Sequence, residues 1–133
     1  SLLKALTTIR EILDESGSKG KIITVFGCGG NRDKAKRPMM GNIAVTNSNE
    51  VIITSDNPRD EEPMSIIEDI KAGISSDNYT VEADRELAIK KAIEISSKGD
   101  IILIAGKGHE TYQEIKGVKH HLSDRELAEK YGK

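Results

Sequence analysis

Aromatic residues are scarce in this chain, which has one phenylalanine, three tyrosines and no tryptophan among its 133 residues. Stacking platforms for single-stranded nucleic acid or for sugars are therefore poorly supplied. An excess of one charge is also missing, because 20 lysines and arginines nearly balance 22 aspartates and glutamates. The net charge of -2 gives no overall field toward nucleic acid or an acidic membrane. We therefore expect no nucleic-acid partner, and only local groups would recognise a charged ligand.

Cysteine and long apolar stretches are scarce as well. The single cysteine, Cys28, excludes an internal disulfide framework, and its two glycine neighbours supply no base to make it a nucleophile. No run of about 18 apolar residues and no secretory signal occurs, so we expect a cytoplasmic protein without membrane insertion. The length of 133 residues, with 36% hydrophobic residues, suits one domain with a single core.

Three short runs of mostly β-branched, apolar residues are present instead, over 22–26, 51–54 and 101–105. Each run is followed by glycine or a turn residue, which is typical of strands buried on both faces of a parallel sheet. A shorter strand is expected over 79–82. Helical patterns lie between these runs, and the end of the chain resembles a hairpin followed by a capped helix. The remaining predicted elements are a helix with the apolar stripe Leu2, Leu6, Ile9 and Leu13, a helix after Pro63, a helix from Asp84 to Ser97, hairpin strands 112–116 and 118–122, and a last helix opened by Ser123 and Glu126. This order predicts an α/β sandwich.

Ligands of parallel α/β sheets collect at the carboxyl ends of the strands. Three loops are expected at that edge, "GCGGNRDKAKR" (27–37), "SDNPRDEEP" (55–63) and "GKGHET" (106–111). All three are rich in glycine or charge, whereas the connections at the opposite edge are ordinary polar turns. The functional edge can therefore be predicted from the sequence.

These loops combine guanidinium, amide and carboxylate groups, which suits a zwitterion such as an amino acid. Arg32 and Arg59 can fork onto a carboxylate, and Glu110 can hold an ammonium group. Each charge-assisted hydrogen bond would contribute about 1.5–3 kcal/mol. Pro58 restricts Asn57 to extended backbone and would help to aim Arg59. The simpler alternative is a turn with a solvated arginine.

Other motifs in the loops are weaker. "GCGG" lacks the spacing of a dinucleotide fingerprint, and "GKGHET" lacks the spacing of a phosphate-binding P-loop. The basic run 32–37 is typical of a solvated loop, with phosphate contact as the alternative. His109 lies beside Glu110 and is a candidate site residue. His120 and His121 would point to opposite faces of a strand, so we expect no metal site.

Taken in order, the stretches "FGCGGNRDKAKRPMMG", "VIITSDNPRDEEP" and "ILIAGKGHETYQ" resemble the C-terminal domain of the Mur ligase family, in the branch that adds diaminopimelate. The resemblance covers nearly the whole chain and implies a Rossmann-like, mostly parallel sheet flanked by helices. It further implies an ATP-dependent amide-bond step in peptidoglycan synthesis. In that step an acyl phosphate forms on the nucleotide-linked glutamate and is attacked by the amine of meso-diaminopimelate.

The resemblance also implies roles for individual residues. The substrate-binding set it implies is Arg32, Asp56, Asn57, Pro58, Arg59, Gly106 and Glu110. Within it Asn57 and Arg59 would bind the distal carboxylate, and Arg59 would distinguish diaminopimelate from lysine. Gly106 and Glu110 would hold the distal ammonium. The positions on the nucleotide side would be Lys34, Lys36, Arg37 and His109.

Several parts of such a ligase are missing from these residues. No glycine loop for ATP, no set of magnesium ligands and no domain for the UDP-sugar occurs. We expect residues 1–133 to be one amino-acid-binding domain of a three-domain enzyme, without catalytic residues of its own. ATP, Mg²⁺ and the UDP-N-acetylmuramoyl-dipeptide would be bound through the missing domains. Two alternatives stay open: a non-catalytic module that binds diaminopimelate or cell-wall peptide, and a related Mur-type or folylpolyglutamate-type ligase domain. A dehydrogenase-type nucleotide domain ranks last.

Overall fold

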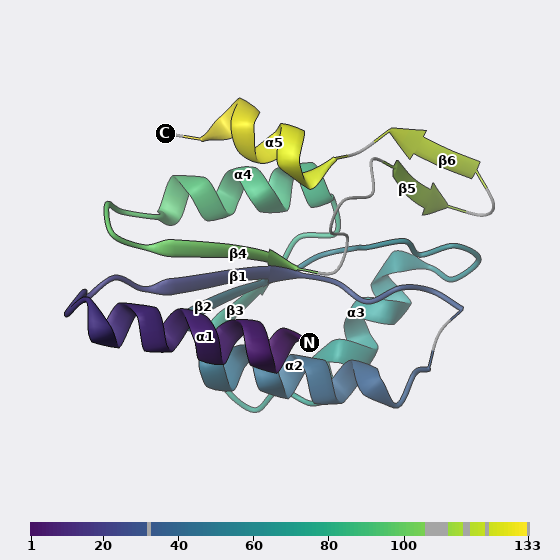
Figure 1. Cartoon of the computed structure of the whole chain (residues 1–133). Helices are drawn as coiled ribbons and strands as arrows, with labels where there is room; N and C mark the ends of the chain where they lie inside the picture. Colours follow the sequence, from purple (N-terminus) through teal and green to yellow (C-terminus); the bar gives the residue numbers. More distant parts are fainter. Residues whose placement is uncertain (32, 106–111, 116–117, 122, 133) are drawn as a thin grey trace.

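The protein folds around a four-stranded parallel sheet, seen in a computed structural model (Figure 1). The structure describes residues 1–31, 33–105, 112–115, 118–121 and 123–132. The strands are β1 (Ile22–Phe26), β2 (Glu50–Ile53), β3 (Tyr79–Val81) and β4 (Ile101–Ala105), arranged in the order β3-β2-β1-β4. All pairings in this sheet are parallel, which confirms the predicted α/β class. A separate antiparallel pair is formed by β5 (Tyr112–Ile115) and β6 (Val118–His121), as the hairpin pattern predicted.

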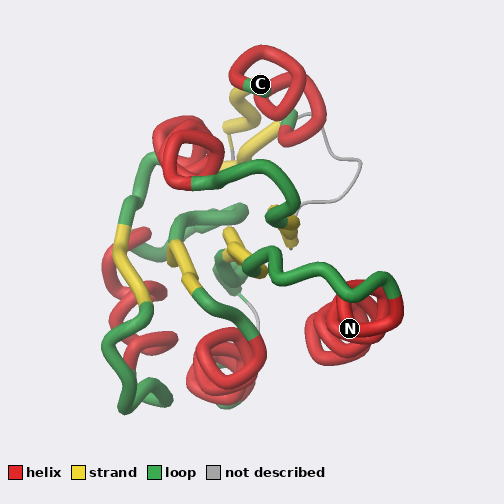
Figure 2. Tube along the Cα trace, turned by 90° about the vertical axis from the view of Figure 1, so that its left-hand side faces the viewer, coloured by secondary structure: helices red, strands yellow, loops and turns green. Residues whose placement is uncertain are grey.

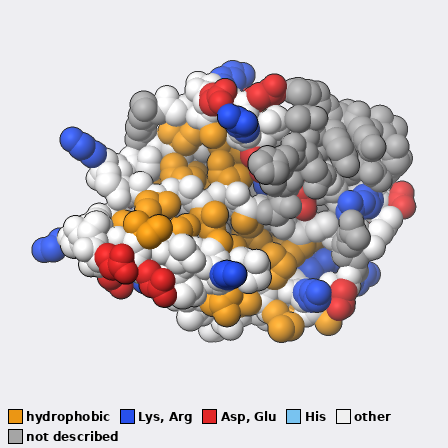
Figure 3. Space-filling model, in the orientation of Figure 1, with side chains coloured by type: hydrophobic (Ala, Val, Ile, Leu, Met, Phe, Trp, Pro, Cys, Tyr) orange, Lys and Arg blue, Asp and Glu red, His pale blue; other side chains and the backbone are white. Residues whose placement is uncertain are grey.

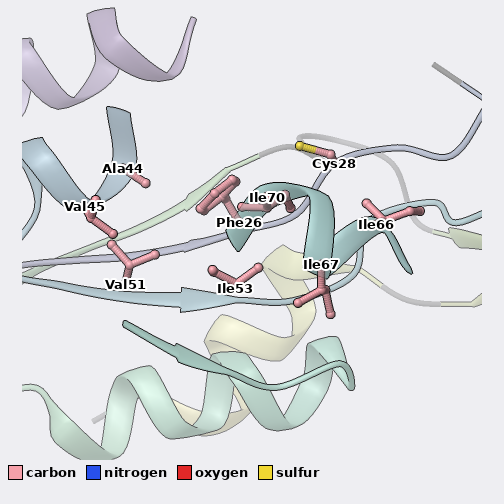
Figure 4. Close-up of a cluster of buried hydrophobic side chains, with 9 residues drawn as sticks. All are labelled: Phe26, Cys28, Ala44, Val45, Val51, Ile53, Ile66, Ile67 and Ile70. Carbon is pink, nitrogen blue, oxygen red and sulfur yellow. The ribbon is translucent and has the colours of Figure 1, made fainter. Parts of the chain in front are cut away.

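Among the described residues, five helices cover the two faces of the sheet (Figure 2). They are α1 (Leu2–Glu15), α2 (Lys36–Asn47), α3 (Pro63–Lys71), α4 (Arg85–Ile95) and α5 (Asp124–Tyr131). Side chains of α2 and α3 pack on Phe26, Val51 and Ile53 in the cluster drawn in Figure 4, and α1 packs beside them on Ile22. Helices α4 and α5 cover the opposite face, against Ile23 and other residues. Because side chains alternate along a strand, each inner strand contributes to both layers and is mostly apolar.

Local sequence signals place most of the helix starts. Pro63 is the first residue of α3, where its missing N–H leaves no bond unmade. Asp84 caps α4 by accepting a hydrogen bond from the backbone N–H of Leu87, as predicted for the helix start. The helix ends at Ile95, two residues before the predicted limit at Ser97, because Ser96 has extended backbone. Ser123 likewise accepts from the N–H of Glu126 and confirms the capping signal for α5.

Helix α2 was missed by sequence reasoning, which extended a loop to Arg37 and gave no element to 38–47. Its apolar stripe is weak, and Pro38 and Gly41 both disfavour a helix. The tertiary structure explains the glycine, because a Cβ on Gly41 would lie 2.4 Å from the carbonyl oxygen of Ile70. Helices α2 and α3 therefore approach each other closely at this point, and packing overrides the local preference.

Strand β4 forms one edge of the sheet, and its side chains are only half-buried. Figure 3 shows hydrophobic side chains gathered on the face of the molecule that carries this edge. A pocket of about 250 Å³ lies beside it, lined by Ile93, Ser96, Ile102, Ile104, Ala128 and Gly132. Within the described ranges, no helix combines the length and the apolar character that a membrane crossing requires.

Candidate functional site

The loops that follow β1 and β2 lie side by side, because these strands are neighbours and end in register at Phe26 and Ile53. Strand β4 lies on the other side of β1, so the point where the strand order reverses lies between β1 and β4, next to the first of these loops. Two of the three predicted loops are thus brought together. The third loop, with Gly106, His109 and Glu110, lies outside the described residues, as does Arg32.

The two loops touch through their backbones at Gly30. Its N–H donates to the carbonyl oxygen of Asn57 at 2.7 Å, and its own carbonyl accepts from Nη1 of Arg59 at 3.0 Å. A Cβ on Gly30 would lie 1.8 Å from the carbonyl oxygen of Pro58. Any larger residue at this position would force the loops apart, so glycine is required for this approach.

Left-handed backbone occurs in both loops. Asn31 has φ of 56° and Arg59 has φ of 53°, and they are the only non-glycine residues with positive φ in the described part of the chain. Such conformations cost about 1–3 kcal/mol and persist where the surroundings hold them, often at binding sites. Asn31 is held partly through its side chain, whose Nδ2 donates to Oδ2 of Asp60 at 3.0 Å. The strain is thus located where the two loops face each other.

The Asp-Asn-Pro-Arg stretch is well ordered by contacts and does not behave as a turn with a solvated arginine. Asn57 is only 2% exposed, Pro58 is buried, and Asp56 and Arg59 are half-buried. Nη1 of Arg59 donates to the carbonyl oxygens of Gly30 and of Asn57, at 3.0 and 3.3 Å. Two backbone carbonyls therefore hold one nitrogen of the guanidinium.

Arg37 departs from the expectation of a solvated basic loop, since it lies in α2 and is 1% exposed. Its Nη1 and Nη2 donate to both carboxylate oxygens of Glu61, at 3.0 and 2.8 Å. Nη1 also reaches Oδ2 of Asp69 at 2.9 Å, and Nη2 donates to the carbonyl oxygen of Gly29 at 3.0 Å. The expectation is wrong because Arg37 is buried and its guanidinium pairs with two carboxylates. Hydrogen bonds to these carboxylates, most of all to Glu61, raise the pKa of Arg37. Lys34 and Lys36 do remain exposed.

Glu61 was not singled out by sequence reasoning, although it connects both loops. Besides Arg37, it accepts the backbone N–H of Asn31 through Oε2 at 2.6 Å. Hydrogen bonds from Arg37 and then from Asn31 lower the pKa of Glu61 to about 2 from an ordinary value of 4.5. The available signal was the acidic run Asp60 to Glu62 directly after Arg59, which could have been paired with the basic run of the other loop.

A pocket of about 420 Å³ opens where β1 leads into α2. It is lined by Gly27, Cys28, Gly29, Asp33, Lys36, Arg37, Met40 and Asp56. Three candidate residues thus share this pocket, whereas Asn57 and Arg59 are outside its lining. Burial, and then the nearby Asp56 charge, raise the pKa of Cys28 to about 11 against the opposing effect of Arg37. This thiol is protonated at neutral pH, so it is no nucleophile there.

Arg85 ties the ends of two strands to the last helix. It is 1% exposed and donates to the carbonyl oxygens of Ser55 and Ala105, at 2.8 and 3.1 Å. Nε and Nη2 also meet the two carboxylate oxygens of Asp124, both at 2.7 Å. Sequence reasoning missed this pair, because each residue resembles an ordinary charge in the first turn of a helix. Within the ranges that the structure describes, no group of three or more His, Cys, Asp or Glu side chains could hold a metal ion.

Comparison with known proteins places these loops in a family. Residues 1–108 match the family described as "Mur ligase, glutamate ligase domain". The chain is 61% identical over 111 residues to the UDP-N-acetylmuramoyl-L-alanyl-D-glutamate--2,6-diaminopimelate ligase of Aquifex aeolicus, covering 83% of this chain and 23% of that protein. It is 52% identical over 129 residues to the enzyme of the same name from Chlorobaculum tepidum, covering 97% and 25%. A solved structure of a protein with this name is 44% identical and has a TM-score of 0.87, covering 98% of this chain and 26% of that one. The chain thus spans about a quarter of the length of these relatives.

Proposed function

The chain belongs to the Mur ligase family as a glutamate ligase domain, and from this we propose that it is the amino-acid-binding domain of an ATP-dependent ligase. The proposed enzyme joins meso-diaminopimelate to UDP-N-acetylmuramoyl-L-alanyl-D-glutamate during peptidoglycan synthesis in the cytoplasm. The names of its relatives support this choice over a non-catalytic binding module. ATP would supply an acyl phosphate on the glutamate, and this domain would orient the attacking amine.

The observation that carries the proposal is the fixed position of Arg59. Its left-handed backbone and its hydrogen bonds to the carbonyls of Gly30 and Asn57 hold the guanidinium at the loop junction. A guanidinium held in this way can form a bidentate pair with the distal carboxylate of diaminopimelate. Lysine has no such carboxylate and would leave that charge unpaired, so the site would select against it.

The other candidate residues take supporting roles in this proposal. Asn57, beside Asp56 and Pro58, would donate its amide to the same carboxylate, and Arg32 would bind the second one. Gly106 and Glu110 would hold the distal ammonium group. Lys34, Lys36 and His109 would face the nucleotide side. Arg37 was expected there too, but its pairing with Glu61 and Asp69 favours a role in holding the loops. ATP, Mg²⁺ and the UDP-linked dipeptide would be bound mainly by further domains, so residues 1–133 alone would not ligate.

A substrate comparison with the protein as its gene encodes it tests this proposal. Ligation of meso-diaminopimelate and of L-lysine would be measured for the natural protein, for Arg59→Ala and for Arg125→Ala as a surface control. Loss of one charge-assisted contact of 1.5–3 kcal/mol predicts that Arg59→Ala lowers kcat/KM for diaminopimelate by about 10- to 150-fold. Activity with lysine should not fall and should rise, because Arg59→Ala removes a charge that lysine leaves unpaired. The surface control should hardly change. Equal losses for both amino acids, or no ligation by the natural protein, would refute the proposal.

A further inference from the structure

The contacts between the two loops converge on one carboxylate. Glu61 accepts from two nitrogens of Arg37 and from the backbone N–H of Asn31, so three donors from the 27–37 segment meet one side chain of the 55–63 segment. Asn31 directly precedes Arg32, and Glu61 follows Arg59 by two residues. A rotation about this junction would therefore change the placement of Arg59, which is proposed to bind the distal carboxylate.

The hydrogen bond from Asn31 to Glu61 contributes little to the overall stability of the fold. Asn31 is exposed, and a hydrogen bond at such a place competes with water. It does hold a residue whose backbone is left-handed, a conformation that needs outside support. The effect of the contact is therefore expected in loop geometry more than in overall stability.

A second carboxylate offers an internal comparison. Asp69, on α3, also binds Arg37, with Oδ2 at 2.9 Å from Nη1, but it makes no contact with Asn31 among the interactions of the described residues. Removing either carboxylate takes one negative charge from Arg37. Only the removal of Glu61 also frees the N–H of Asn31.

We infer that Glu61 is a positioning residue for amino-acid recognition, which acts through Asn31 and Arg37 to set the spacing of the two substrate-binding loops. This inference rests on the proposed function, because the loops matter for recognition only if they bind the amino acid. Glu61 itself would not touch the reacting atoms. Glutamine at this position would keep the size of Glu61 without its charge. Its N–H₂ group would face one of the N–H donors of Arg37 or Asn31, and because two donors cannot bond to each other, the junction would open.

Steady-state kinetics of Glu61→Gln and Asp69→Asn, in the protein as its gene encodes it, test the inference. We expect Glu61→Gln to raise KM for the diamino acid roughly tenfold while KM for ATP stays within about twofold. Asp69→Asn should leave both KM values near those of the natural protein. Equal effects of the two substitutions on KM, or an equal rise in KM for ATP and the amino acid, would overturn the inference.

Hydrogen–deuterium exchange without substrate gives an independent readout. A peptide that contains Asn31 should exchange at least roughly tenfold faster in Glu61→Gln than in the natural protein or in Asp69→Asn. No difference would overturn the positioning role even if the enzyme is active. A different outcome would be faster exchange in Glu61→Gln while the natural protein does not use diaminopimelate. This would refute the proposed function, and with it the kinetic part of this inference.

Discussion

Arg85 and Asp124, which are 39 residues apart in the sequence, form a buried ion pair through two hydrogen bonds of 2.7 Å each. The same guanidinium binds the carbonyl oxygens of Ser55, two residues after β2, and of Ala105, the last residue of β4. The pair therefore joins the last helix to the edge of the sheet that carries the candidate site. The position of that edge thus depends on a buried charge pair between residues that no local pattern links.

Replacing Asp124 with alanine should lower the free energy of unfolding by about 3–5 kcal/mol, because the buried Arg85 would be left without its counter-charge. Urea denaturation measures this change. The matched control is Glu129→Ala, which breaks the ion pair of α5 with Arg125, whose side chains are 72% and 85% exposed. That substitution should cost no more than about 0.5 kcal/mol. Similar costs for the two variants would contradict the role given to the buried pair.

Glu61 should make stability depend on pH in a defined window. Arg37, the N–H of Asn31 and the more distant Lys34 lower its pKa in the folded protein to about 2, from an ordinary 4.5. The ionised form is favoured by folding, so its contribution is complete above about pH 5 and is lost as the pH falls toward 2. The difference in unfolding free energy between the natural protein and Glu61→Gln should shrink over this range. If this difference in unfolding free energy stays constant down to about pH 2, the ionised form of Glu61 is not its cause.

Cys28 should react slowly with alkylating reagents in the folded protein. It is 9% exposed, and burial raises its pKa to about 11, so only about one thiol in a thousand is ionised at pH 8. Alkylation by iodoacetamide, followed by mass spectrometry, should be at least roughly 100-fold slower than for the same chain in urea. Equal rates in both conditions would mean that the thiol is accessible and activated.

Gly30→Ala should weaken amino-acid use and cost about 1–3 kcal/mol of stability, because the new methyl group would meet the carbonyl of Pro58 at 1.8 Å. Gly17→Ala serves as the comparison, since Gly17 has open space around it and its φ of 68° makes alanine strained there too. It should also reduce stability, but leave KM for the amino acid unchanged. A KM for Gly30→Ala equal to that of the natural protein would show that the loop spacing is not important for binding.

The sequence by itself determined the strands of the sheet and the edge at which two of the predicted loops meet. The runs 22–26, 51–54 and 101–105 appear as β1, β2 and β4, because the strands of a parallel sheet with helices on both faces are mostly apolar. The expected burial on both faces holds for β1 and most of β2, whereas β4, at the edge of the sheet, is half-buried. Three helix starts are marked by signals within one turn: a proline at the first position (Pro63) and side-chain caps (Asp84 and Ser123). Two of the predicted loops do meet at the carboxyl edge, because neighbouring parallel strands end together.

Only the tertiary structure decided which charges meet. Glu61 and Arg37 are 24 residues apart, and Arg85 and Asp124 are 39 apart, so no local pattern pairs them. Helix α2 also depends on its packing against α3. Gly41 permits the close approach of the two helices, although glycine by itself disfavours a helix. Periodicity and caps are local and can be read from the chain, whereas the partner of a buried charge is set by how the helices pack on the sheet.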